Sequence, residues 1–105
     1  MEKTIVINTN ACIIVCMDFE WDSDKNNVNI TKHGLSFRNA KSAFSDKHRI
    51  IMFDEYHSKS EKRYFCIGKT TDGRIATVRF TIRNGCIRII GAGYWRKGKM
   101  KYEQR

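Results

Sequence analysis

Two dipeptides in the second half of the chain strongly predict tight hairpin turns. Asp72-Gly73 and Asn84-Gly85 each connect runs of β-forming residues, and both central residues of a type I′ turn need positive φ, which Asn, Asp and Gly adopt most readily. The runs that they connect cover residues 63–69, 74–83 and 86–92. We expect these three segments to form an antiparallel meander, with a fourth strand at 49–54 before them.

The middle segment of this meander is predicted to have two different faces. Small and apolar residues occupy every second position, at Ala76, Val78, Phe80 and Ile82. Successive side chains of a strand point to opposite faces, so these residues should face helices that cover the sheet. The opposite face should then carry Arg79 and Arg83 toward solvent.

Two short helices are predicted before these strands. Asp22 or Ser23 can cap the first helix, because both side chains accept hydrogen bonds from free N–H groups at a helix start. Gly34 can supply the left-handed residue that ends this helix after Lys32-His33. The second helix can begin at Ser36, and its apolar residues recur at spacings of three and four, at Phe37, Ala40, Ala43 and Phe44.

The order of these elements predicts an α+β fold. Two short N-terminal helices pack on an antiparallel β-meander sheet, and the apolar face of the second helix belongs to the core. The tail at 94–105 is rich in Lys and Arg, and Gly98 lowers its helix propensity. We expect a basic C-terminal helix or arm.

The C-terminal third of the chain carries almost all of the net charge. From Arg74 to Arg105 there are nine Lys and Arg residues and one acid, Glu103, so this part carries eight of the nine net positive charges. Phosphates and carboxylates gain free energy in such a field. The pattern favours a polyanionic partner, nucleic acid or an acidic protein, although a merely solvated basic face has the same composition.

The length of the chain and its cysteine positions exclude several protein classes. A chain of 105 residues supports one core, and the apolar stretch at 11–17 is too short to span a bilayer. The four cysteines include no Cys-x-x-Cys pair, and no secretory leader precedes them. We expect a cytoplasmic protein with reduced thiols and no metal or other cofactor. A metal site using Cys12, Cys16, His33 or His57 is the weaker alternative, because their spacing fits no standard site.

A series of short motifs extends over residues 18–92. The motifs are Phe19-Glu20-Trp21-Asp22, Lys25, Asn29, Lys32-His33-Gly34, His57-Ser58-x-x-Glu61-x-Arg63, Ile67-Gly68, Asp72-Gly73-Arg74 and Arg88-Ile89-Ile90. Each motif alone is weak, but their order and spacing resemble the BrnT family of toxin ribonucleases from bacterial toxin–antitoxin pairs. Within the first motif, we interpret Phe19 and Trp21 as core or hydrophobic-staple residues rather than base-stacking ones.

The resemblance implies a RelE-type architecture and a metal-independent endoribonuclease that blocks translation. It also implies RNA as the substrate and a cognate antitoxin, BrnA-like and DNA-binding, that silences the toxin. For the assembly, two alternatives are expected: a homo-oligomer or a toxin–antitoxin heterotetramer.

The first sixteen residues differ from the rest of the chain. Because the motif at Phe19 normally lies near the start of family members, Met17 reads as an alternative initiator. Residues 1–16 would then be an N-terminal extension and 17–105 a single BrnT-like toxin domain. Residues 5–7 and 13–16 are β-prone, with a turn at 8–10, and the second run could continue through Phe19 as one strand.

Ribonuclease chemistry of this kind needs a base for the ribose 2′-hydroxyl, cations for the phosphate and an acid for the leaving oxygen. The residues that could supply these groups are His33, His57, Glu61, Arg63 and Arg88. Four of these residues have a structural alternative. His33 could instead cap the last carbonyls of its helix. Glu61 and Arg63 could form a surface ion pair, and Arg88 could pair with an acid of the same sheet.

Further basic and aromatic residues fit an electrostatic track for an RNA backbone with rings for base stacking. The candidate RNA-binding residues are Lys32, Arg74, Arg79, Arg83, Tyr94, Arg96, Lys97, Lys99 and Lys101, and Trp95 and Tyr102 could also stack. An acidic antitoxin segment could occupy the same surface as RNA.

The chain departs from the family pattern after Ile90. Family members usually have Ser and Arg where this chain has Gly91 and Gly93, and a Glu where it has Lys99. Arg96 could replace the missing arginine from a shifted tail. The departure also motivates a second hypothesis, a catalytically degenerate module of the same fold that binds nucleic acid or a protein partner through its basic surface.

Overall fold

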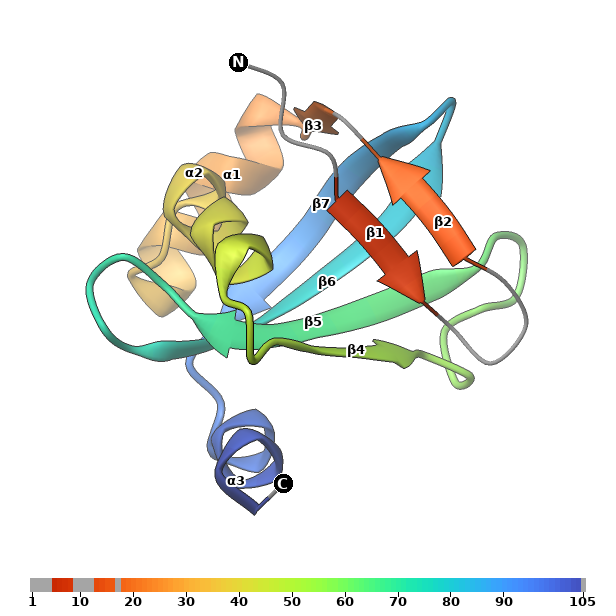
Figure 1. The fold of residues 1–105 in the computed structure, drawn as a ribbon. Helices are drawn as coiled ribbons and strands as arrows, with labels where there is room; N and C mark the ends of the chain where they lie inside the picture. The colour runs from red at the N-terminus through yellow and green to blue at the C-terminus, as the bar shows by residue number, and fades with distance from the viewer. Residues whose placement is uncertain (1–4, 9–12, 17, 105) are drawn as a thin grey trace.

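A five-stranded sheet in the order β3-β7-β6-β5-β4 organises the computed structural model, which describes residues 5–8, 13–16 and 18–104 (Figure 1). Its strands are β3 (Asp18–Glu20), β4 (Ile50–Phe53), β5 (Arg63–Lys69), β6 (Ile75–Arg83) and β7 (Cys86–Gly93). Strands β4 to β7 are antiparallel neighbours, which confirms the predicted meander. The sheet as a whole is mixed, because β3 pairs with β7 in parallel.

The N-terminal β-prone runs form β1 (Ile5–Asn8) and β2 (Ile13–Cys16), which pair antiparallel as a separate two-stranded sheet. The expectation that β2 continues through Phe19 as one strand is wrong. Phe19 lies in β3, whose backbone pairs with β7 in the other sheet. Part of the predicted turn, residues 9–10, and the alternative start Met17 lie outside the described residues.

The two predicted hairpin turns differ from each other. Asn84 and Gly85 have φ of 52° and 76°, as a type I′ turn requires. At the other site only Gly73 has positive φ, and the pairing of Lys69 with Ile75 leaves a five-residue loop. The type I′ expectation is therefore wrong there. The Asp72 carboxylate explains the longer loop, because it accepts hydrogen bonds within it, from the Thr70 hydroxyl and from the Arg74 N–H.

The predicted helix starts and stops are confirmed. In α1 (Ser23–His33), Asp22 accepts a hydrogen bond from the Lys25 N–H at 3.0 Å. The helix ends at Gly34, with φ of 64° and its N–H donated to the Ile30 carbonyl at 2.8 Å. Ser36 caps α2 (Phe37–Ala40), which continues as a short 3-10 helix, η1 (Lys41–Ser45).

The core lies between α2, η1 and one face of the sheet. Phe44 makes edge contacts with Phe80 of β6 and Phe19 of β3, at ring-centroid distances of 5.0 and 5.1 Å. Trp21 meets Phe37 at 6.3 Å. The apolar face of the second helix is therefore a core face, and Phe19 and Trp21 are packing residues, as the sequence predicted.

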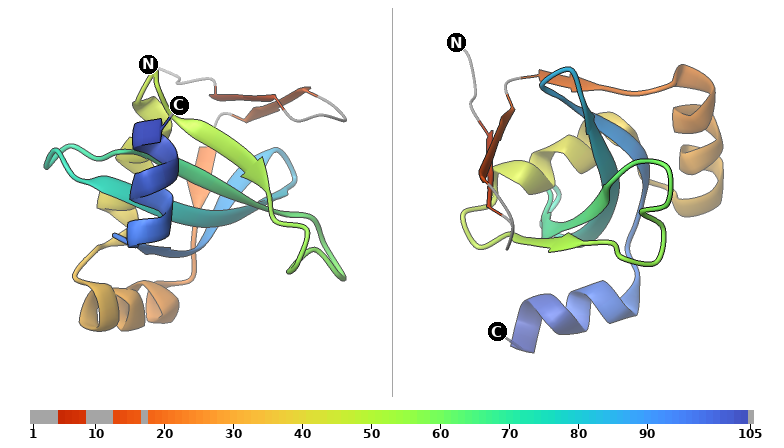
Figure 2. Two further views of the ribbon diagram at one scale, coloured as in Figure 1. Left: turned by 90° about the horizontal axis from the view of Figure 1, so that it is seen from below. Right: turned by 90° about the vertical axis from the view of Figure 1, so that its right-hand side faces the viewer.

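The C-terminal tail forms α3 (Arg96–Gln104) on the opposite side of the sheet from α2 (Figure 2). Gly98 faces β6 so closely that a Cβ there would lie 1.9 Å from the Thr77 hydroxyl oxygen. Near the end of α3, Tyr102 donates a hydrogen bond to Asp46 at 2.6 Å. In the described part of the chain, no helix is long and apolar enough to cross a lipid bilayer.

Candidate functional site

The candidate site lies on the face of the sheet that points away from α2, here called the outer face. Arg63, Thr81 and Arg88 are cross-strand neighbours on β5, β6 and β7. The residues beside them in sequence, such as Tyr64, Phe80 and Ile89, are in the core. Because strand side chains alternate, Arg63, Thr81 and Arg88 point to the outer face, as do Arg79 and Arg83 two residues away from Thr81.

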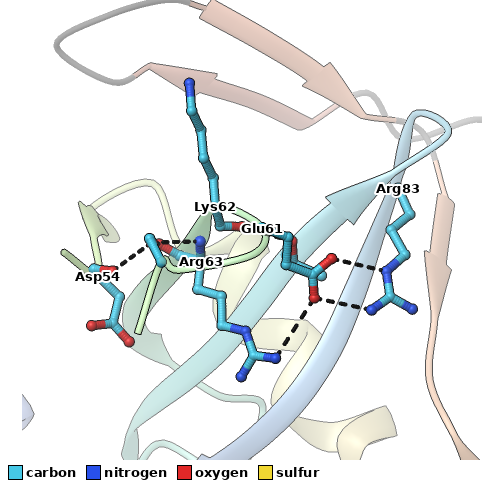
Figure 3. A network of polar contacts seen from close by, with 7 residues as sticks. Asp54, Glu61, Lys62, Arg63 and Arg83 are labelled. Atoms are coloured by element: carbon cyan, nitrogen blue, oxygen red, sulfur yellow. Dashed lines mark hydrogen bonds and ion pairs between the residues drawn. The ribbon is translucent and has the colours of Figure 1, made fainter. Parts of the chain in front are cut away.

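Glu61 lies between two of these arginines (Figure 3). Arg83 donates two hydrogen bonds to its carboxylate, from Nε at 3.1 Å and from Nη2 at 3.0 Å. Arg63 Nη2 lies 3.6 Å from the same carboxylate. The figure also shows that Lys62 points away from this cluster. The predicted neighbourhood of Glu61 and Arg63 thus exists, and it includes Arg83.

This arrangement weakens Glu61 as a base. The hydrogen bonds from Arg83, with the charges of Arg83, Arg63 and Arg88, hold the pKa of the Glu61 carboxyl below its usual range. A carboxylate held ionised in this way takes up a proton less readily than a free glutamate does. The Glu61 carboxylate forms ion pairs with Arg63 and Arg83 and thereby positions both side chains.

Arg88 also has a carboxylate partner in the same sheet. Its Nη1 donates a hydrogen bond to Glu20 of β3 at 3.0 Å. Both side chains are partly exposed, at 28% and 41%. A phosphate could therefore approach Arg88, but it would compete with Glu20 for the guanidinium.

His57 lies in the loop after β4 and is held by Asp54. The imidazole Nδ1 lies 2.8 Å from the Asp54 carboxylate, which is buried, whereas the His57 side chain is 48% exposed. The backbone N–H of His57 donates to the other Asp54 oxygen at 3.3 Å. A carboxylate on Nδ1 fixes the orientation of an imidazole and leaves Nε2 available, as in catalytic His–Asp pairs.

His33 ends α1 and makes no hydrogen bond to any residue that the structure describes. Gly34, and not the imidazole, closes the helix end. The His33 ring contacts Trp95 edge to face, at 5.2 Å between centroids. An exposed imidazole beside an exposed indole is available to a ligand, so the capping alternative for His33 does not apply.

A groove of about 300 Å³ runs between α1 and β7 and joins His33 to Arg79. Its basic residues are Lys25, Lys32, His33 and Arg79, and Asp24 is its one acid among the described residues. The sequence suggested that Arg79 points freely into solvent, but the structure differs. It is half-buried against β7, where a Cβ at Gly91 would lie 2.9 Å from its Nη2.

Gly93, the second glycine at which the chain departs from the family pattern, also lies next to a side chain. A Cβ at Gly93 would lie 2.8 Å from the indole of Trp95. Trp95 covers this glycine and remains 38% exposed. The space that a side chain at Gly93 would enter is thus taken by an aromatic ring.

The remaining predicted RNA-binding residues lie on or near α3. Four of them are exposed along the helix: Arg96, Lys97, Lys99 and Lys101. Arg74 stacks on the ring of Tyr94 at 3.5 Å, and the Tyr94 hydroxyl donates to Asp72 at 3.1 Å. Tyr94 is therefore engaged within the protein, and Trp95 is the better placed ring for stacking.

Sequence reasoning missed two buried polar residues. Asn29 was recognised only as part of a motif, yet its amide joins α1 to Ala92 of β7 and to the Leu35 carbonyl. Asp54, which holds His57, was not singled out. Its place at the end of an apolar strand, three residues before a histidine, is a signal that could have identified it.

The structure divides the predicted catalytic residues into separate groups. Glu61 and Arg63 are in contact, and Arg88 is the cross-strand neighbour of Thr81, which itself pairs with Arg63. Within residues 18–104, no hydrogen bond, ion pair or ring contact joins either His33 or His57 to them. No group of three His, Cys, Asp or Glu side chains in the described residues could hold a metal ion. Cys12 lies outside those residues.

Comparisons with known proteins give a family and a fold. The family model described as "Ribonuclease toxin, BrnT, of type II toxin-antitoxin system" matches residues 21–98. A crystal structure of the Brucella abortus ribonuclease toxin BrnT is similar, with a TM-score of 0.60 and 23% sequence identity, over 75% of this chain and 96% of that chain. No curated protein matches the sequence. At this identity, the structural likeness bears on the α+β fold alone.

Proposed function

Because the chain belongs to the BrnT family of ribonuclease toxins from type II toxin–antitoxin systems, we propose that it is a metal-independent endoribonuclease that cleaves RNA and thereby inhibits translation. One observation carries this proposal. Four arginines lie on a single face of the sheet, flanked by an exposed histidine on α1 and by the basic helix α3. This face offers both positive charge and groups that transfer protons.

The proposed reaction begins when a base removes the proton of a ribose 2′-hydroxyl. The 2′-oxygen attacks the adjacent phosphorus, the bond from phosphorus to the 5′-oxygen breaks, and an acid protonates that oxygen. The products are a 2′,3′-cyclic phosphate and a 5′-hydroxyl. Cationic side chains stabilise the charge that builds on the phosphate oxygens.

We assign proton transfer to His33 and His57 and charge stabilisation to Arg63 and Arg88. His33 has no hydrogen-bond partner in the described structure, and His57 is oriented by Asp54. The role of Glu61 is to position Arg63 and Arg83, because its carboxylate is held by both. RNA would displace Glu61 from Arg63 and Arg83, and Glu20 from Arg88.

The proposed partners are RNA and a cognate BrnA-like, DNA-binding antitoxin, either in a toxin–antitoxin heterotetramer or with the toxin as a homo-oligomer. An acidic antitoxin segment on the outer face would exclude RNA, since both need the same arginines. The proposal includes a RelE-type architecture and a cytoplasmic location, where both substrate and antitoxin are found.

The test compares His33→Ala and Arg63→Ala with the control His48→Ala, which removes an exposed imidazole outside the site. The first two variants should lose growth arrest and RNA cleavage while keeping the far-ultraviolet circular dichroism of the wild type. Cleavage should persist in excess EDTA. Full activity of both variants would remove the site assignment, and loss of cleavage in EDTA would remove metal independence.

The alternative is a catalytically degenerate member of the family that only binds nucleic acid or a protein partner. The ion pairs favour it, because Arg63, Arg83 and Arg88 are already occupied by Glu61 or Glu20. Purified protein that leaves total RNA and ribosome-bound messages intact, yet binds RNA in a salt-dependent way, would decide for this alternative.

A further inference from the structure

We propose that the groove between α1 and β7 binds one phosphodiester of the RNA substrate, with Arg79 as the side chain that contacts the phosphate and Lys32 and His33 beside it. This inference rests on the proposed function for the identity of the ligand. It adds a phosphate subsite and a specific arginine that the family match does not assign.

The first argument is that Arg79 has no counterion among the residues that the structure describes. The other arginines of the outer face, Arg63, Arg83 and Arg88, each contact a glutamate. Arg79 makes no hydrogen bond or ion pair with any residue that the structure describes, and its Nε is buried without a partner. A guanidinium that is half-buried and unneutralised is poised for an anion from outside the chain.

The second argument is that the backbone is shaped around this guanidinium. The register between β6 and β7 shifts after Arg79, which pairs with Gly91, whereas Phe80 pairs with Ile89. Such bulges re-aim side chains. At Gly91 a Cβ would lie 2.9 Å from Nη2 and 3.3 Å from Nε of Arg79. The groove can hold the guanidinium where it is because position 91 has no side chain.

The third argument is the chemistry of the groove. Lys25, Lys32 and His33 of α1 line it together with Arg79, against one acid, Asp24. A cluster of cationic groups in a concave surface suits a phosphate, whose oxygens accept several charge-assisted hydrogen bonds.

The fourth argument favours RNA over an acidic protein segment. Trp95 contacts His33, which lines the groove, and exposes 38% of its surface. An aromatic ring beside a phosphate site provides a stacking surface for the neighbouring base, and single-stranded nucleic acids are commonly bound in this way. An acidic segment of Asp and Glu has no base that could stack on this ring.

The experiment measures the binding of a short, single-stranded 2′-O-methyl RNA, which cannot be cleaved at its 2′-oxygens. Arg79→Ala and Gly91→Ala should each weaken binding about tenfold and lower the dependence of log affinity on log salt by about 0.7, the value for one phosphate on a single strand. Gly91→Ala keeps every charge, so its effect would come from the displaced guanidinium. Arg38→Ala removes one exposed arginine of α2 and should bind like the wild type.

A second measurement does not depend on variants. The Nε–H signal of Arg79 in a ¹⁵N NMR spectrum should shift when the same RNA is added. Unchanged affinity and salt dependence in both variants, or an unshifted signal, would overturn the proposal. Oligoglutamate, tested with the same variants, stands for an acidic protein segment. If Arg79→Ala and Gly91→Ala lose oligoglutamate binding but keep RNA binding, the groove binds a protein segment and the proposal is overturned. Arg79-dependent binding without any cleavage of ordinary RNA would support the subsite and count against the ribonuclease proposal alone.

Discussion

The side-chain amide of Asn29 pairs with the backbone of Ala92 in both directions. Its Nδ2 donates to the Ala92 carbonyl at 2.9 Å, and its Oδ1 accepts from the Ala92 N–H at 3.2 Å. These are the bonds that a neighbouring strand would make, at a point on β7 beyond its three paired residues with β3. Asn29 thus completes the edge of the sheet and sets the position of α1 beside it.

Asn29→Ala should therefore destabilise the protein by roughly 2–3 kcal/mol, because it leaves the buried Ala92 backbone groups without partners. Urea unfolding followed by tryptophan fluorescence measures this loss. The control is Asn27→Ala on the exposed side of the same helix, which should change stability little. Equal midpoints for the two variants would show that the Asn29 pairing carries no weight.

Glu61→Gln should raise the affinity for RNA about fivefold at low salt, the effect of roughly 1 kcal/mol expected for one unit charge at close range in water. Arg63 and Arg83 would lose their negative partner, and RNA would no longer compete with it. Glu55→Gln, which changes an exposed acid earlier in the same loop, controls for net charge. A loss of cleavage beyond about 100-fold with affinity intact would instead identify Glu61 as the general base.

Glu61 also makes stability depend on pH. Its pKa is lowered in the folded state, chiefly by the hydrogen bonds from Arg83. Its contribution is therefore complete above the ordinary pKa of a glutamate and is lost as the pH falls through the lowered value. Wild type should be more stable than Glu61→Gln at neutral pH, and the difference should shrink as the pH falls through the lowered pKa of Glu61. A difference that grows on acidification would contradict this sign.

Gly98→Ala should destabilise the protein by about 1–3 kcal/mol, through steric overlap of its Cβ with Thr77. At an exposed helix position the same change would stabilise by about 1 kcal/mol. Hydrogen exchange of α3 amides should report the loosening. Adding Thr77→Ala should restore part of the stability, since that side chain presents the clashing oxygen. Faster exchange in the double variant than in Gly98→Ala would contradict this account.

Charge reversal of Lys97, Lys99 and Lys101 to Glu should weaken RNA binding across sequences. It should reduce the salt dependence by about 2 on a log–log plot, if each lysine meets one phosphate of a single strand. The matched variant reverses three exposed lysines elsewhere, Lys41, Lys47 and Lys59. If both triple variants lose affinity equally, net charge and not α3 is responsible.

The fold was predictable where the deciding interactions are local. The Asn84-Gly85 turn, the Asp22 and Ser36 caps and the Gly34 exit depend on residues within four positions of one another. The pairing of Asp18 with Cys86 has no such signal, because it joins segments from opposite ends of the chain. The Asp72 loop shows a related limit, since a backbone turn from Thr70 to Gly73, with side-chain hydrogen bonds to Asp72, formed in place of the expected two-residue turn.

The site was predictable in residue type more than in arrangement. Alternation along β6 correctly indicated that Arg79 and Arg83 share the face opposite Val78 and Phe80. It could not show that Arg83 finds Glu61, or that Gly91 makes room for Arg79, because these contacts cross strands. Asn29 was missed for a similar reason, because its partner Ala92 lies 63 residues further along the chain. Asp54 was missed although its contact with His57 is local, three residues along the same loop.

The glutamates of the outer face make it resemble an ion-exchange surface. Arg63, Arg83 and Arg88 each contact Glu61 or Glu20, so a bound phosphate replaces a carboxylate and does not add to an arginine without a partner. A lone inorganic anion gains little by this exchange. A polymer that displaces Glu61 and Glu20 together gains from several exchanges at once while giving up its freedom of movement only once. These three arginines should therefore bind free phosphates and metabolites weakly and respond to chains of phosphates, whereas Arg79, which has no partner among the described residues, takes no part in this exchange.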